Sequence, residues 1–138
     1  MNRSSRKSAE TSQRELILNV MAVSLAASSP YLIAATQQLQ DDVFQAMEAN
    51  GFWSGPQDST PAKIALIHSE LSEALEADRK NIESDDKVPD FTGLEAELAD
   101  TLIRIYDLAG RNNLRLGEAL VAKMAYNLGR PFKHGKAY

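Results

Sequence analysis

Two pairs of acidic residues have a spacing that could bind a metal ion. Glu70 and Glu73 form the first pair, and Glu97 and Asp100 form the second. Residues three apart on a helix lie about 60° from each other, so each pair would occupy one helical face. If two such faces meet, about four negative charges converge and repel one another unless a cation binds between them. We therefore expect these four carboxylates to be metal ligands.

The ligand types predict which metal would bind. Sites built only from carboxylate oxygens suit Mg²⁺, with Mn²⁺ as a possible substitute. The chain has no Cys and only two His, which argues against zinc or copper. A di-iron site would require a His three residues after a ligand Glu, whereas Glu73 and Asp100 occupy those positions. Acid pairs at this spacing also occur on solvated helix faces, and Asp100 could instead pair with Arg104, so the residues alone leave these alternatives open.

Positive charge is concentrated near the C-terminus, although the chain as a whole is acidic. There are 15 Lys and Arg against 19 Asp and Glu, a formal charge of −4. This balance argues against nucleic acid or an anionic membrane as the main partner. The C-terminal residues predicted to bind an anion are Lys123, Asn127, Arg130 and Lys136. A triphosphate is the natural ligand for cations that lie beside a divalent metal.

Helical periodicity and capping signals predict the elements that carry these residues. Ser29–Pro30 predicts the start of a first helix that ends at Asn50–Gly51. Thr92 and Glu95 have the spacing of a capping box. The other predicted helices cover residues 60–81, 93–110 and 116–128. Because no segment alternates polar and apolar residues for long enough to form a strand, the predicted fold is an all-α four-helix bundle.

Apolar residues recur at helical spacing and are expected to face the core. These residues are Ile64, Ile67, Leu71 and Leu75 in the second helix, Leu94, Leu98, Leu102 and Ile105 in the third, and Leu120 and Met124 in the fourth. Small and apolar residues also accompany the acids on the opposite faces. We therefore expect another element to cover the acidic faces as well.

The chain divides into an N-terminal arm, residues 1–29, expected to be partly ordered or helical, and a functional domain, residues 30–138. Basic residues precede an apolar run over residues 16–27, which is similar in outline to a signal peptide. Glu10 and Glu15 dilute the basic region, and the run is too short to span a bilayer. We expect a cytoplasmic protein without a membrane segment. A core this small would gain from burial in an oligomer.

The pairs Glu70/Glu73 and Glu97/Asp100 are separated by 23 residues. This pattern resembles the signature of the MazG-like all-α nucleoside triphosphate pyrophosphohydrolases. The strings AELADTLIRIYDLAG and KMAYNLGRPFKHGK are also similar to the third helix and the phosphate-binding end of that family. The resemblance covers residues 30–138. It implies a MazG-like bundle that hydrolyses a nucleoside triphosphate to the monophosphate and pyrophosphate with Mg²⁺. It also implies a homodimer or homotetramer with active sites where subunits meet.

The resemblance gives each candidate residue a role. Glu70, Glu73, Glu97 and Asp100 would hold Mg²⁺, and Glu73 is the first candidate to activate the attacking water. Lys123, Arg130 and Lys136 would contact the phosphates, with Asn127 as a neutral hydrogen-bonding partner, and His134 could assist. Trp53 could stack on the base or pack in the core, whereas Phe52 is expected in the core.

Other functions remain open at this stage. Phosphoribosyl-ATP pyrophosphatases and dimeric dUTPases use similar acidic helices on other substrates, and no residue here identifies the base. A helical regulatory or oligomerisation protein could keep the fold without catalysis. All four acids are present, which favours an enzyme of nucleotide-pool housekeeping over such a protein.

Overall fold

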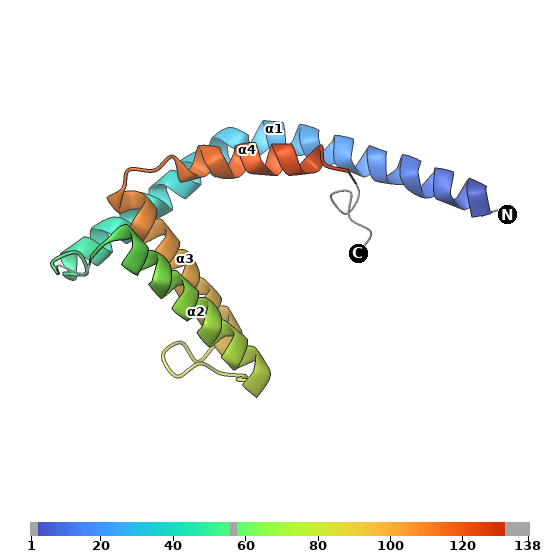
Figure 1. Cartoon of the computed structure of the whole chain (residues 1–138). Coiled ribbons are helices and arrows are strands. Elements are labelled where there is room, and N and C mark those ends of the chain that lie inside the picture. Colours follow the sequence, from blue (N-terminus) through green and yellow to red (C-terminus); the bar gives the residue numbers. More distant parts are fainter. Residues whose placement is uncertain (1–2, 56–57, 132–138) are drawn as a thin grey trace. The chain divides into compact units, whose positions relative to one another are not determined.

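A computed structural model of the chain describes residues 3–55 and 58–131 and folds them into helices (Figure 1). These are α1 (Arg3–Ala49), α2 (Thr60–Lys80), α3 (Gly93–Arg111) and α4 (Leu116–Leu128). No strand occurs among the described residues. The predicted all-α fold class is therefore confirmed.

The predicted start of the first helix at Ser29–Pro30 is wrong, because α1 continues through Pro30 without interruption. A proline inside a helix removes one backbone donor and crowds the preceding turn. In the turn before Pro30, the Ser28 hydroxyl donates to the Ser24 carbonyl at 2.9 Å and the Ser29 hydroxyl donates to the Leu25 carbonyl at 2.6 Å. Helix-forming sequence on both sides outweighs the proline signal.

Helix α1 also contains a stretch, within Thr11–Ala49, that is long and apolar enough to cross a membrane. Length and composition are the only criteria that it meets, and a signal sequence or the core helix of a soluble protein can meet them too. No charged residue occurs between Leu16 and Gln40. The expectation that the apolar run is too short to span a bilayer is therefore wrong, because the helix continues past residue 27. The expectation of a cytoplasmic protein stays a prediction.

The remaining helices begin and end close to their predicted limits. Ser59 caps α2, whose C-cap Asn81 adopts the left-handed conformation at φ 49°. The predicted capping box of α3 is confirmed, because the Thr92 side chain accepts from the Glu95 backbone N–H while the Glu95 side chain accepts from the Thr92 backbone N–H. Helix α4 has the predicted bounds.

The chain forms two compact units, and each is considered by itself. One comprises residues 38–114, in which α2 and α3 run side by side (Figure 1). Gly110 lies against α1 in this unit, where a Cβ atom would overlap the side chain of Phe44. The other unit combines the described residues 3–37 and 115–131. There Gly117 allows α4 to approach the backbone of Ile33.

The apolar stripes predicted to face the core are largely exposed within this single chain. Leu71 and Leu75 are 44% and 50% exposed on α2, and Leu98 and Leu102 are 44% and 52% exposed on α3. Leu120 and Met124 on α4 are also exposed, so the prediction that they face the core is wrong. Phe52 was expected in the core too, but it is exposed.

The buried face of α2 instead carries Lys63, Glu70, Ala74 and Ala77. Leu71 follows Glu70 by one residue and so points about 100° away from this face. The expectation that another element covers the acidic face is confirmed for Glu70, which is 7% exposed. The alanines of this face are small and permit the close approach of α3.

Candidate metal centre

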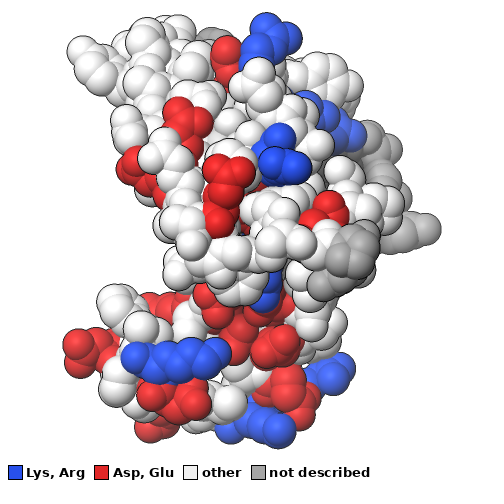
Figure 2. Space-filling model, turned by 90° about the vertical axis from the view of Figure 1, so that its left-hand side faces the viewer, with Lys and Arg blue, Asp and Glu red and all other residues white. Residues whose placement is uncertain are grey.

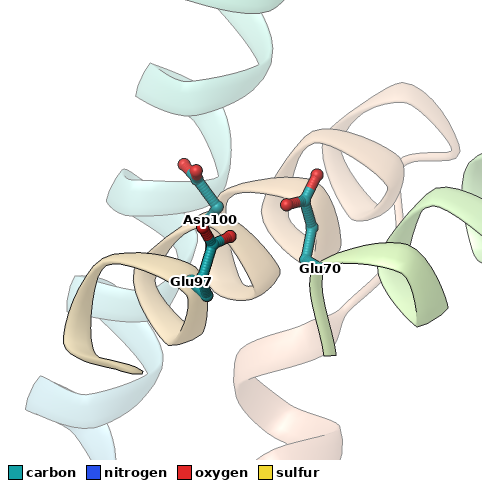
Figure 3. Close-up of side chains that lie close together, drawn as sticks. All are labelled: Glu70, Glu97 and Asp100. Carbon is teal, nitrogen blue, oxygen red and sulfur yellow. The ribbon is translucent and has the colours of Figure 1, made fainter. Parts of the chain in front are cut away.

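Three of the four predicted metal ligands meet where α2 packs against α3. Glu70 extends from α2 towards Glu97 and Asp100, which belong to α3 (Figure 3). One carboxylate oxygen from each of these residues lies within 4.8 Å of the other two. Glu70 is buried, whereas Glu97 and Asp100 are half-buried. We call these three residues the acid triad.

Small residues and close contacts hold the two helices at the distance that the triad requires. Gly93 begins α3, and a Cβ atom there would lie 2.9 Å from the Ile82 side chain and 3.1 Å from the Ala77 Cβ. The Gly93 backbone N–H also donates to the Ile82 carbonyl at 3.0 Å. These contacts fix the N-terminus of α3 against the C-terminal end of α2, one turn before Glu97.

Residues 81–91 of the loop between these helices are exposed except for Asp85, which ties the loop together. Asp85 is 9% exposed, and one oxygen of its carboxylate accepts from the backbone N–H groups of Lys87 and Val88 at 2.9 Å each. These two bonds are the main reason that the pKa of Asp85 is lowered from its ordinary value, and the bond from Val88 has the larger effect. The loop thereby places Lys87 where its charge acts on the Glu97 carboxylate.

Negative charge dominates the surroundings of the triad, and Figure 2 shows Asp and Glu side chains gathered over the α2–α3 hairpin. The pKa of Glu97 is raised, first by burial and then by repulsion from Glu73, Asp100 and Glu70. Lys87 only partly opposes this rise. The arrangement therefore disfavours the ionised form of Glu97 until positive charge is added.

Arg104 supplies the nearest positive charge to Glu70. Its Nε atom donates to Glu70 Oε1 at 2.8 Å, and the side chains are 26% and 9% exposed respectively. The sequence suggested an ion pair of Arg104 with Asp100, one turn earlier on the same helix. The structure pairs Arg104 across the helix interface with Glu70 instead.

Glu73, the fourth predicted ligand, lies beside the triad but is not one of its members. It is exposed and accepts a hydrogen bond from the Ser69 hydroxyl at 3.3 Å. Together with Glu97 it lines a hollow of about 330 Å³ that extends to Asp85 and Asp86. A carboxylate in this position has access to water, but its predicted role in water activation stays a prediction.

Three of the predicted phosphate-binding residues lie in the other unit. Lys123 and Asn127 lie on α4 and Arg130 follows its end, whereas Lys136 and His134 lie outside the described residues. Lys123 Nζ is 5.3 Å, and Arg130 Cζ 5.9 Å, from the centre of the Tyr126 ring. Two of the predicted phosphate-binding cations therefore contact the Tyr126 ring at the end of α4.

Trp53 belongs to a separate group of interactions at the start of α2. Its indole N–H donates to Asp107 Oδ1 at 2.6 Å, and Lys63 Nζ lies 4.1 Å from the centre of the ring. Lys63 is itself buried, donates to the Phe52 carbonyl at 2.6 Å and pairs with Asp58 at 3.4 Å. These contacts anchor Trp53 to the fold, and its contact with a base stays a prediction.

Asp107 and Lys63 are the residues that the sequence analysis missed. Asp107 is 2% exposed and lies seven residues after Asp100, while Lys63 lies seven residues before Glu70. A spacing of seven returns to nearly the same helical face. Extending the acidic faces by two turns in either direction would therefore have identified both residues.

The donors of the triad fit a hard divalent cation. Three carboxylate oxygens from two helices can approach one ion, since opposite ligands of Mg²⁺ lie roughly 4 Å apart at metal–oxygen distances of about 2.1 Å. Comparison of the chain with protein-family models, characterised proteins and solved structures gives no match.

Proposed function

We propose that this protein hydrolyses nucleoside or deoxynucleoside triphosphates to the monophosphate and pyrophosphate with Mg²⁺ as cofactor. The observation that supports this most is the convergence of Glu70, Glu97 and Asp100 from two helices to within 4.8 Å. Bound Mg²⁺ would neutralise phosphate oxygens and the charge that develops as the phosphate bond breaks. The resemblance of the acidic pairs to the MazG-like signature selects this reaction among those of oxygen-ligated metals.

In this proposal the residues of the chain position the reactants. Glu73 lies at the edge of the triad and has access to solvent, so it can accept a proton from the attacking water. The water oxygen forms a bond to the α-phosphorus, the bond to the bridging oxygen breaks, and pyrophosphate leaves. We assign contacts with the phosphates to Lys123, Asn127, Arg130 and Lys136.

We further propose that the protein is a cytoplasmic homodimer or homotetramer. The exposed leucines of α2 and α3 support the oligomer, because apolar stripes on two adjacent helices are normally covered by protein. The resemblance to MazG-like proteins, which implies oligomers, agrees with it.

The direct test measures the products formed from each triphosphate with Mg²⁺. Pyrophosphate release is expected for at least one of the nucleoside and deoxynucleoside triphosphates. Activity confined to dUTP or to phosphoribosyl-ATP would assign one of the related activities instead. Orthophosphate release would indicate a phosphatase, and no release from any member of the panel would favour a non-catalytic helical protein.

A substitution then links any activity to the triad. We expect Asp100→Asn to reduce turnover by on the order of a hundredfold or more while leaving the helical circular-dichroism signal unchanged. Asp78→Asn removes the same charge from an exposed position on α2 and serves as the matched control. Near-normal turnover of the Asp100→Asn variant would reject the metal assignment.

A further inference from the structure

The pairing of Arg104 with Glu70 suggests a role that the proposed reaction does not itself assign. Arg104 follows Asp100 by four residues, so both lie on the face of α3 that meets α2. Its guanidinium bonds to the most buried acid of the triad at 2.8 Å. It is therefore positioned among the groups that a divalent cation would contact.

The metal-free protein needs such a charge because a buried carboxylate without a partner is strongly unfavourable. Glu70 also lies within 4.8 Å of two further carboxylate groups. Lys87 acts on Glu97, and Glu73 adds a further negative charge to its surroundings. Within the described part of the chain, Arg104 is the cation that forms an ion pair with a member of the triad.

A guanidinium and a divalent cation compete for the same carboxylate. Both are positive, and Arg104 is bonded directly to Glu70. A cation held by the triad would therefore repel Arg104 at short range. Glu70 Oε1 also loses basicity towards a metal while it accepts the Arg104 hydrogen bond. Binding of the cation therefore favours release of the guanidinium.

We infer that Arg104 is an internal counter-ion that orients Glu70 in the metal-free protein and is displaced when a divalent cation binds the triad. This inference rests on the proposed metal site but concerns a positioning residue rather than a ligand. It predicts that Arg104 stabilises the metal-free fold while lowering the affinity of the triad for metal. A purely structural arginine would not have this second effect.

The test measures Mn²⁺ binding to the metal-free, full-length protein by calorimetry, without nucleotide. We expect Arg104→Gln to bind Mn²⁺ about tenfold more tightly than the wild type and to melt at a lower temperature without metal. Arg104→Lys, which keeps the charge, should bind Mn²⁺ with an affinity close to that of the wild type. Arg111→Gln removes the same charge from the same helix, where Arg111 pairs with Glu48 at 3.9 Å, and should not change the affinity.

Equal or weaker Mn²⁺ binding by the Arg104→Gln variant would overturn the counter-ion role while leaving the proposed function intact. Failure of the wild type to bind Mn²⁺ would reject the metal site and with it both proposals. Since the Arg104→Gln variant could fail to fold, a second measurement uses the wild type alone. The Arg104 Nε–H resonance, assigned through its loss in the Arg104→Lys variant, should shift on addition of Mg²⁺, and an unchanged resonance would contradict displacement.

Discussion

At the scale of single residues, the triad shows a conflict between stability and metal binding. The carboxylates that could bind a cation also repel one another, and burial is the first cause of the rise in the pKa of Glu97. A raised pKa means that the folded protein binds a proton at Glu97 more readily than the unfolded chain does. This favourable contribution is complete below the unfolded pKa of 4.5 and is lost as the pH rises through the higher folded value.

Glu97→Gln should therefore stabilise the metal-free protein at pH 7, because it removes an ionised group from a repulsive site. We expect its melting temperature to exceed that of the wild type by a few degrees at pH 7 and the difference to vanish below about pH 4.5. Thermal melting in chelator across this pH range measures the effect. Saturating Mg²⁺ should reverse the order, and a lower melting temperature of the variant in chelator at pH 7 would contradict the repulsion.

The sequence was sufficient to identify the acids but not their partners. Spacing along one helix determines which residues share a face, and this placed Glu97 beside Asp100 correctly. It could not show that Arg104 reaches Glu70 on the other helix, because that contact depends on how α2 and α3 pack. The same limit applies to Trp53, whose partner Asp107 lies far along the chain.

At the scale of elements, the best-predicted helices are those with a local chemical signal at their ends. The Thr92–Glu95 capping box and the Asn81 cap are local, so α2 and α3 were located accurately. Pro30 is equally local but was misread, because support from both sides lets a helix continue through proline. The leucine stripes were predicted to be buried within one chain, but they are exposed there. Hydropathy indicates that such a face is covered, but it does not indicate whether the covering element belongs to the same chain.

Helix α4 leads to a prediction about the substrate. Lys123 contacts the Tyr126 ring, as Arg130 does, and lies far along the chain from the triad, so it should affect phosphate binding without affecting metal binding. We expect Lys123→Ala to raise the KM for a triphosphate about tenfold, or roughly 1.4 kcal/mol, as for the loss of one charge-assisted contact. Steady-state kinetics measure the KM, and calorimetry measures the affinity for Mn²⁺.

Arg115→Ala provides the control for this substitution. Arg115 precedes α4 and is eight residues, or about 12 Å along the helix, from Lys123. The control substitution removes the same charge and should leave KM unchanged. An unaltered KM for the Lys123→Ala variant would place the anion site elsewhere, and a change in its Mn²⁺ affinity would contradict the separation of the two functions.

At the scale of the whole molecule, the question is what covers the apolar surface. Helix α1 is uncharged between Leu16 and Gln40, and lipid could cover it. However, α4 lies beside α1, where Arg14 donates to the Arg130 carbonyl at 3.2 Å, and α4 carries Glu118 and Lys123. Placing Lys or Arg at the centre of a bilayer costs about 2.5–3.5 kcal/mol each. The charges near α1 agree with the proposal that a second copy of the chain, rather than lipid, covers this surface.

A charge introduced into the leucine stripe of α2 should separate the copies. Burying one leucine contributes roughly 2 kcal/mol, and an unpaired carboxylate in its place adds a desolvation penalty, so Leu75→Glu should shift an oligomer towards the monomer. Light scattering coupled to gel filtration measures the mass across a dilution series. Lys80→Gln, which changes the net charge by the same amount at an exposed position about 140° around α2 from Leu75, should keep the wild-type mass. A wild-type protein that is monomeric at all concentrations would show that the exposed leucines are not an interface between copies, and the subunit-interface site implied by the resemblance would lose its support.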